Sequence, residues 1–462
     1  MRFSVLWRIL VAQALSSFGT SMSTVALGFM IYKLTGSVLH MGAVMAVSTF
    51  PLVITSWIGG AALDRFAAKY VMVAADLARA VLIFLLPSVA RAEIGLVYVI
   101  AALVGVCTAF FNPGQLKLVG ELVSPDHLVK ANSYLGVSQT VAELLGYLVS
   151  GVVVTAVGYV VAFYTDAGSY VLSALLLLGL PRPQPRTEPP ASVLALLRES
   201  PAVLGRLWRH PMLRTNLLFA LFPMLVFMTG MPNSYGLALA IFDRGAAGVA
   251  TLEVAISCGF IVGGLVLSRL TLSRDKNLYV FMSFLAMALC LVGVYLSPSF
   301  WVAVAFLGLA GVANVGVLVP SVTMFQEIPS PGERGRLIAL RAGFGQVGST
   351  GGLLLGGSLG EALGITQSFL LAGLLAIGLS VLIYIPYYVG QRRRAEAAWA
   401  EALALGAKRV DARQLAEQAA LTGRPELGSV VAGLKGSEPA GVAEAERSKS
   451  ARPAGPYDDH VE

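Results

Sequence analysis

The chain has 462 residues, of which 56% are hydrophobic and only 13% are charged, and its formal net charge is +7. About a quarter of the residues of a soluble globular protein are charged, so this composition excludes an ordinary soluble domain and indicates a protein embedded in lipid. The histidines (His40, His127, His210 and His460) fall in predicted loops or in the tail, and no Walker A motif occurs. These observations argue against an enzyme, a metal site, a cofactor and ATP-driven pumping.

Apolar runs long enough to cross about 30 Å of hydrocarbon as a helix occur twelve times. The predicted spans are residues 9–32, 40–63, 70–90, 94–112, 132–156, 159–180, 214–241, 246–268, 277–297, 300–325, 336–360 and 365–390. Strands of a β-barrel would be short and would alternate in polarity. The sequence therefore predicts an all-α membrane protein with twelve transmembrane helices.

Basic residues indicate the orientation of these spans. With the N-terminus in the cytoplasm, the outer loops carry only Lys33, Arg91 and Arg244. The inner loops and the start of the tail carry most of the other lysines and arginines, as the positive-inside rule requires. We expect both termini in the cytoplasm and attribute the net charge to the anionic inner leaflet rather than to nucleic acid.

A short segment and the span that follows it occur twice, 206 positions apart. Glu121-Leu-Val-Ser-Pro125 corresponds to Glu327-Ile-Pro-Ser-Pro331. Small residues then recur at every fourth position, namely Ala142, Gly146 and Ser150 in the first copy and Gly348, Gly352, Gly356, Gly360 and Gly364 in the second. The repeat predicts two pseudo-symmetric six-helix bundles, an arrangement typical of secondary transporters. We expect the stripes to allow close helix packing against partners that slide during transport.

Composition changes divide the chain into four regions. We predict a first transmembrane bundle over residues 1–180, a central cytoplasmic loop over 181–213, a second bundle over 214–390 and a cytoplasmic tail over 391–462. The central loop begins with a proline-rich break and continues with a pattern that fits an amphipathic surface helix or a solvated linker. The end of the tail is typical of disorder.

The loop between the second and third spans resembles a signature of the major facilitator superfamily. It reads Gly60-Ala-Ala-Leu-Asp64-Arg65-Phe-Ala-Ala-Lys69, in which the Gly, the Asp-Arg pair and the final Lys match the signature. The corresponding loop of the second half has Ser268 where the first has Asp64. Together with the duplication, this resemblance implies the twelve-helix major facilitator fold.

Other stretches resemble the macrolide-efflux and siderophore-export branch of the drug:proton antiporters. They are Tyr32-Lys-Leu-Thr-Gly36-Ser37, Asp76-Leu-Ala-Arg79, Asn112-Pro113, Leu128-Val-Lys-Ala-Asn132 and Asp166-Ala-Gly-Ser-Tyr170. The resemblance implies a transporter of the bacterial cytoplasmic membrane that exchanges small amphipathic substrates for protons. Bacterial lysophospholipid transporters are also similar over Gly120-Glu-Leu and Leu128 to Asn132, and a nutrient symporter is a further alternative. We expect a monomer.

Carboxylates inside the bilayer are the first candidates for proton coupling. Glu143 lies in the middle of the fifth span, Glu253 in the eighth, and Asp166 near the outer end of the sixth, where we expect water to reach it. Ionisable groups in hydrocarbon are costly and therefore suggest a function. The structural alternative is a neutral carboxyl group bonded to a neighbouring helix.

Five residues are candidates for gating. Asp76 and Arg79 are three residues apart and can pair on one face of a helix. In the resembled family, the aspartate that Asp64 matches sits against the start of the eleventh span and latches the cytoplasmic side, with ordinary loop capping as the alternative. Arg65 follows it in the same signature, and Arg341 is a possible second partner.

By resemblance, the first, fourth, seventh and tenth spans line the substrate cavity. They carry almost no charge, so we expect no arginine or lysine in the cavity and a preference for varied apolar shapes. The candidate lining residues, some of which must instead face lipid, are Phe110, Asn112, Phe222, Phe227, Met228, Asn233 and Asn314.

Overall fold

The computed structural model describes residues 3–63, 67–123, 127–181, 204–205, 207–270, 275–329 and 331–404. In these ranges the chain forms long helices joined by short connections. Its contacts divide it into two compact units, Met1–Tyr384 and Ile385–Glu462. The larger unit contains the first predicted bundle and all of the second except residues 385–390.

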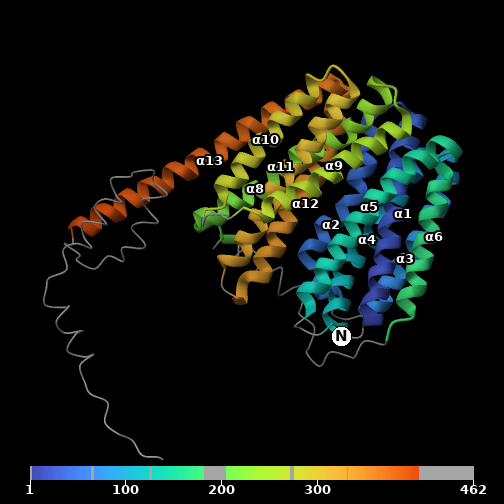
Figure 1. The fold of residues 1–462 in the computed structure, drawn as a ribbon, viewed down its shortest axis with the longest axis horizontal. Coiled ribbons are helices and arrows are strands. Elements are labelled where there is room, and N and C mark those ends of the chain that lie inside the picture. The colour runs from blue at the N-terminus through green and yellow to red at the C-terminus, as the bar shows by residue number, and fades with distance from the viewer. Residues whose placement is uncertain are drawn as a thin grey trace, which may run out of the picture. The chain divides into compact units, whose positions relative to one another are not determined.

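The first half of the larger unit is a bundle of long helices, coloured from blue to green in Figure 1. α3 packs against α4 and α6, α1 packs against α5 and α6, and α2 packs against α4. The helices are α1 (Phe3–Thr35), α2 (Val38–Leu63), α3 (Ala68–Ala92), α4 (Ile94–Leu122), α5 (Leu128–Val157) and α6 (Tyr159–Leu178).

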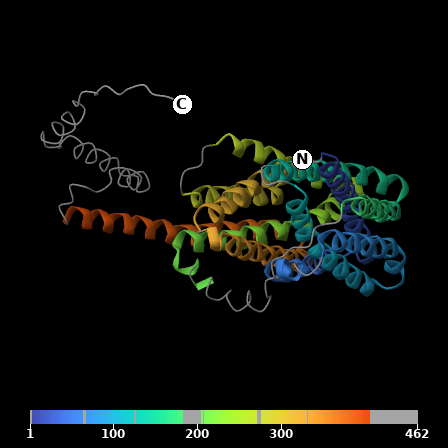
Figure 2. The same cartoon turned by 90° about the horizontal axis from the view of Figure 1, so that it is seen from below.

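The second half repeats this arrangement, and Figure 2 shows its yellow and orange helices gathered beside the blue and teal helices of the first half. α12 packs against α8 as α5 packs against α1, and α10 packs against α11 as α3 packs against α4. The helices are α8 (Pro211–Gly236), which continues into the π-helix η2 (Leu237–Ile241), α9 (Gly245–Ser268), α10 (Asn277–Tyr295), α11 (Phe300–Glu327), α12 (Pro331–Leu363) and α13 (Ile365–Ala404).

The twelve predicted spans correspond to twelve long helices in the described part of the chain. Eleven of these are long and apolar enough to cross a membrane. The remaining one is α12, whose first turns carry Glu333, Arg334 and Arg336 and whose interior is rich in glycine. The all-α membrane fold is thus confirmed. The low hydropathy of α12 comes from its charged first turns and from the glycines that pack against α8.

The glycine stripe of α12 lies directly against the backbone of α8. A Cβ atom at any of three stripe glycines would overlap a carbonyl oxygen of α8, so only glycine permits this approach. The overlaps pair Gly348 with Leu221, Gly352 with Leu225, and Gly356 with Thr229, in steps of four on both helices.

The small residues of α5 make the equivalent contact with α1. A Cβ on Gly146 would overlap the carbonyl oxygen of Phe18, and the hydroxyl of Ser150 donates to the carbonyl of Met22 at 2.9 Å. Both stripes therefore act inside a half, because α1 and α5 belong to one bundle and α8 and α12 to the other. The expectation that they face sliding partners is corrected accordingly.

The two halves meet instead through α2 with α12 and α5 with α9. At the first contact, the hydroxyls of Thr49 and Thr350 lie 3.1 Å apart, and the Ser37 hydroxyl donates to Glu361 at 2.9 Å. A different face of α12 is used here, since Gly357 lies against the backbone of Leu39. The contact of Ser37 with Glu361 lies at the predicted outer ends of α2 and α12, whereas the contact of Thr49 with Thr350 lies near the middles of these helices, just outside the residues Leu52 and Gln346.

Glycines with left-handed backbone angles end two equivalent helices. Gly158 follows α5 with φ of 94°, and Gly364 follows α12 with φ of 106°. Their numbers differ by 206, the offset of the sequence repeat. Only glycine adopts this conformation without strain, so the turns into α6 and α13 are part of the duplication.

Two predicted regions fall largely outside the described residues. These are the central loop over 181–213, apart from its last part, and the end of the tail beyond Ala404. The start of the tail is described, because α13 continues without a break to Ala404.

Candidate substrate cavity and buried polar groups

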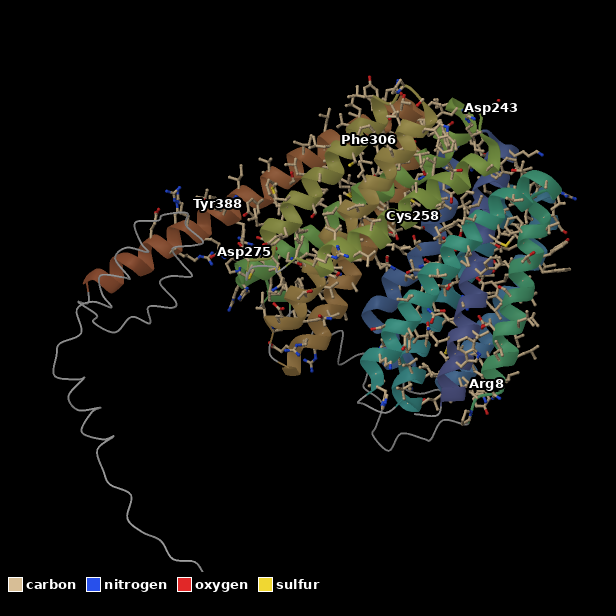
Figure 3. The ribbon with its side chains drawn as sticks, in the orientation of Figure 1. Arg8, Asp243, Cys258, Asp275, Phe306 and Tyr388 are labelled. Atoms are coloured by element: carbon tan, nitrogen blue, oxygen red, sulfur yellow. The ribbon has the colours of Figure 1, made fainter. Side chains whose placement is uncertain are left out.

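A cavity of about 550 Å³ lies between the two halves. Its walls come from the second parts of α2, α4 and α11 and the first parts of α8 and α12, which all lie toward the predicted cytoplasmic side. Figure 3 labels Arg8, near the start of α1 at the predicted cytoplasmic side, and Asp243, just after η2 at the predicted outer side. The apolar part of the lining is Leu52, Ala109, Pro113, Leu116, Phe219, Ala220, Pro223, Met224, Val317, Leu318, Ala339 and Ala342.

Few polar side chains line this cavity. They are Thr55, Asn112, Asn314, Gln346 and Arg341, and no carboxylate is among the described lining residues. Cavities of this size and character fit one small molecule with an apolar body and a few oriented polar groups. Arg341 departs from our expectation of a cavity without basic residues. The first part of α12 was not expected in the wall.

Arg341 is held by a chain of hydrogen bonds that crosses the second half. Its Nε donates to the Ser321 hydroxyl at 2.8 Å, which donates to Asn216 Oδ1 at 2.7 Å. The amide of Asn216 in turn donates to Asn277 Oδ1 at 3.1 Å. Sequence reasoning missed these three partners because they lie on three helices other than that of Arg341, although each is a polar residue within or beside an apolar run.

The predicted lining residues separate into two groups. Asn112 and Asn314 line the cavity, whereas the other five do not belong to its lining. Asn233 is fully buried and donates to the carbonyl of Gly356 at 2.7 Å, so it serves the contact between α8 and α12. Phe227 is buried with its ring centroid 6.0 Å from that of Phe260. Phe110, Phe222 and Met228 are half-buried elsewhere.

Glu143 ends a chain of amide side chains in the first half. It accepts a hydrogen bond from Gln139 Nε2 at 2.8 Å, and Gln139 Oε1 accepts one from Gln13 Nε2 at 2.8 Å. Gln115 Nε2 donates to Gln13 Oε1. The chain crosses α4, α1 and α5, and it starts about one turn from Asn112 in the cavity wall. The three glutamines were not singled out from the sequence.

Glu253 and Asp166 are both almost completely buried. The Oε1 atom of Glu253 and the hydroxyl of Tyr235 are both buried, and neither has a hydrogen-bond partner among the described residues. Asp166 accepts from the Ser23 hydroxyl at 2.5 Å. We expected water to reach Asp166, but it is only 1% exposed, because α1 packs over it and Gly19 brings the two backbones together.

Asp76 and Arg79 form the ion pair that their spacing predicts. Ser173 also donates to Asp76, at 2.7 Å. The Arg79 guanidinium lies between two rings, 4.3 Å from the centroid of Phe111 and 4.4 Å from that of Tyr170. This pair ties α3 to α4 and α6 deep in the first bundle.

The loop signature is only partly within the described residues. Asp64 and Arg65 lie outside them, so the predicted latch stays a prediction. Lys69 is buried and donates to the carbonyls of Leu178 at 2.8 Å and Leu180 at 2.5 Å. A cation at the C-terminal end of a helix stabilises its unpaired carbonyls, so the last residue of the signature secures the end of α6.

Two six-helix bundles related by a repeat, with an apolar cavity between them, define a secondary transporter. The chain belongs to the Major Facilitator Superfamily, whose family profile matches residues 9–297 and 258–432. Members of this family are transporters of small substrates across membranes and not enzymes.

Proteins of known sequence and structure are similar over most of the chain. An uncharacterized MFS-type transporter of Bacillus subtilis, YfiS, is 24% identical over 84% of this chain and 94% of its own. The multidrug efflux pump Tap of Mycolicibacterium fortuitum is 24% identical over 82% and 95%. Macrolide efflux protein A of Streptococcus pyogenes is 22% identical over 83% and 95%.

The crystal structure of the nucleoside transporter NupG shares the fold. It superposes with a TM-score of 0.63 at 14% identity and covers 83% of this chain and 98% of its own. This likeness supports the major facilitator fold alone.

Proposed function

We propose that this protein exports small amphipathic compounds, such as drugs or secondary metabolites, in exchange for protons by alternating access. The observation that carries the proposal is the largely apolar cavity of about 550 Å³ between the halves, on the predicted cytoplasmic side. A compound that partitions into the inner leaflet or dissolves in the cytoplasm reaches the cavity from that side. Two of the relatives are named as a multidrug and a macrolide efflux protein, which supports export.

Closure of the opposite side also supports this cycle. The contact of Thr49 with Thr350, near the middles of the helices, and that of Ser37 with Glu361, at their outer ends, hold the halves together on the outer side of the cavity. An export cycle requires this arrangement when substrate is loaded, and it requires these contacts to break when substrate is released.

For proton coupling, Glu143 is the first candidate, with Glu253 and Asp166 as alternatives. A carboxyl group surrounded by helices can exist in a neutral and a charged form, and its partners decide between them. Glu143 is joined to the cavity wall by the Gln139, Gln13 and Gln115 amides. A change of its charge can thereby alter the hydrogen bonding beside Asn112.

Accumulation and susceptibility in an efflux-deficient bacterial host test the export function. The compounds are macrolides, cationic dyes, siderophores and lysophospholipids, and the control is the empty vector. Export predicts lower accumulation and higher tolerance for at least one amphipathic compound, and loss of both when a protonophore collapses the gradient. Reduced accumulation of lysophospholipids alone would favour the lipid alternative. Increased uptake of a nutrient would contradict export.

We also propose that the chain acts as a monomer in the bacterial cytoplasmic membrane with both termini inside. An epitope tag placed after Tyr388 should be protected in intact cells. Its accessibility from outside would contradict this orientation.

A further inference from the structure

Arg341 differs from the other buried basic side chains of the described residues. Arg79 pairs with Asp76, Lys276 pairs with Glu327, and Lys69 binds two carbonyl groups. Arg341 is 9% exposed, yet it takes part in no ion pair among the described residues. Its partner is the neutral hydroxyl of Ser321.

A buried arginine without a counter-ion lowers the stability of the fold unless an anion binds to it and neutralises its charge. Removing a guanidinium from water without a counter-ion is strongly unfavourable. Its Nε is bonded to Ser321, and Asn216 and Asn277 fix that hydroxyl in turn. Its two terminal nitrogens make no hydrogen bond to the described residues, so this arrangement holds the guanidinium in the wall with those nitrogens available to an acceptor. A guanidinium binds the two oxygens of a carboxylate, sulfonate or phosphate in a fork.

The other residues that line the cavity indicate the chemistry of the rest of the ligand. Phe219, Met224 and Leu116 are among the residues that offer apolar surface, while Asn112 and Asn314 offer neutral hydrogen bonds. We infer that the transported compounds are amphipathic anions, with one acidic group bound by Arg341 and an apolar body in contact with α4 and α8. The inference rests on the proposed export function and gives its substrate class.

Paired fluorescent probes test this inference on the full-length protein in nanodiscs. 1-Anilinonaphthalene-8-sulfonate carries one negative charge, and N-phenyl-1-naphthylamine has the same ring system without the sulfonate. Empty nanodiscs give the lipid contribution, which is subtracted. The variants are Arg341→Met, Arg341→Lys and the control Arg334→Gln, which removes a charge from an exposed position of the same helix.

We expect wild type to bind the sulfonate more tightly than the neutral probe. Arg341→Met should lower affinity for the sulfonate by about tenfold or more, the scale of a charge-assisted hydrogen bond. It should leave affinity for the neutral probe unchanged. Arg341→Lys should retain most of the sulfonate binding, and Arg334→Gln should retain all of it. Equal losses for both probes in Arg341→Met would contradict the inference and assign Arg341 a structural role.

Competition on wild-type protein keeps the test decisive if Arg341→Met does not fold. Laurate should displace the bound sulfonate probe at lower concentration than methyl laurate, which lacks the charge. Equal displacement by laurate and methyl laurate would overturn the inference. So would wild-type protein that binds only the neutral probe, because a carboxylate of the chain, such as Asp64, would then already neutralise Arg341. If neutral compounds are exported and anions are not, this inference alone fails. If no amphipathic compound is bound or exported, the proposed function fails.

Discussion

Glu143 is the residue at which proton coupling is most directly testable. Substitution by glutamine keeps the shape of the side chain and its bond to Gln139, but it removes the charge and imitates the protonated form. We expect Glu143→Gln to bind substrate while its transport no longer depends on the pH gradient. Substrate efflux from proteoliposomes, measured with and without an imposed gradient, gives the result.

The matched control for this variant is Glu93→Gln, which changes an exposed carboxylate in the connection between α3 and α4. It should transport like wild type. Gradient-driven transport by Glu143→Gln at the wild-type rate would show that the charge of Glu143 plays no part in coupling. Glu253 and Asp166 would then become the leading candidates.

The Asp76–Arg79 pair supports a second prediction at the scale of single residues. Asp76→Leu leaves Arg79 as an uncompensated buried charge, which should cost about 3–5 kcal/mol of stability. Adding Arg79→Met should recover much of the loss, since an apolar replacement of both partners is often tolerated. Thermal unfolding followed by size-exclusion chromatography ranks the stability of wild type, Asp76→Leu and the double variant. A double variant no more stable than the single one would show that the pair contributes more than mutual neutralisation.

At the scale of helices, the fit of α12 against α8 depends on the absence of Cβ atoms at the stripe glycines. Gly352→Ala would place such an atom on the carbonyl oxygen of Leu225, so the helices must separate, at a cost of about 1–3 kcal/mol. Its neighbour Gly351 has room, with the nearest atom of Leu225 at 3.9 Å from the added Cβ. Because alanine also favours the helix, Gly351→Ala should be neutral or stabilising.

Thermal unfolding of the purified variants distinguishes these two cases. We expect a lower unfolding midpoint for Gly352→Ala and an unchanged or higher one for Gly351→Ala. Equal unfolding midpoints for the two variants would mean that α8 moves away from the added Cβ at little cost and that the glycine stripe does not determine how α12 packs against α8.

Sequence patterns predicted the helices far better than their partners. The length of an apolar run is read directly from the chain, so all twelve helices were expected near their observed positions. Which helix a stripe faces depends on contacts between distant segments, and the partner of Gly352 on α8 could not be read from its spacing. Asp166 was misplaced for the same reason, since its burial depends on α1 and not on its own helix.

The candidate site was less predictable than the fold. Asn112 and Asn314 were identified because they lie on spans that line the cavity by resemblance, but the same rule selected Asn233, which serves packing. Arg341 was assigned to a gate because its sequence neighbours are at a helix start. Only the three-dimensional arrangement of α2, α4, α8, α11 and α12 places it in the cavity wall.

For the whole molecule, alternating access requires the contacts on the predicted outer side to break. The hydroxyls of Thr49 and Thr350 are 3.1 Å apart across the two halves, so cysteines at both positions should cross-link under mild oxidation. The background needs Cys107, Cys258 and Cys290 replaced, since these thiols are free. We expect cross-linking to stop transport and reduction to restore it, as measured by efflux from proteoliposomes. Full activity of the cross-linked protein would rule out opening at this contact.

The central claim is that a proton gradient drives amphipathic compounds out through this cavity. Inside-out membrane vesicles test it most directly, because export then appears as uptake of a fluorescent substrate. Vesicles that contain the protein should accumulate substrate when their interior is acidified and release it when nigericin collapses the pH gradient, while vesicles without the protein should do neither. Accumulation that is equal with and without the gradient would contradict proton-coupled export.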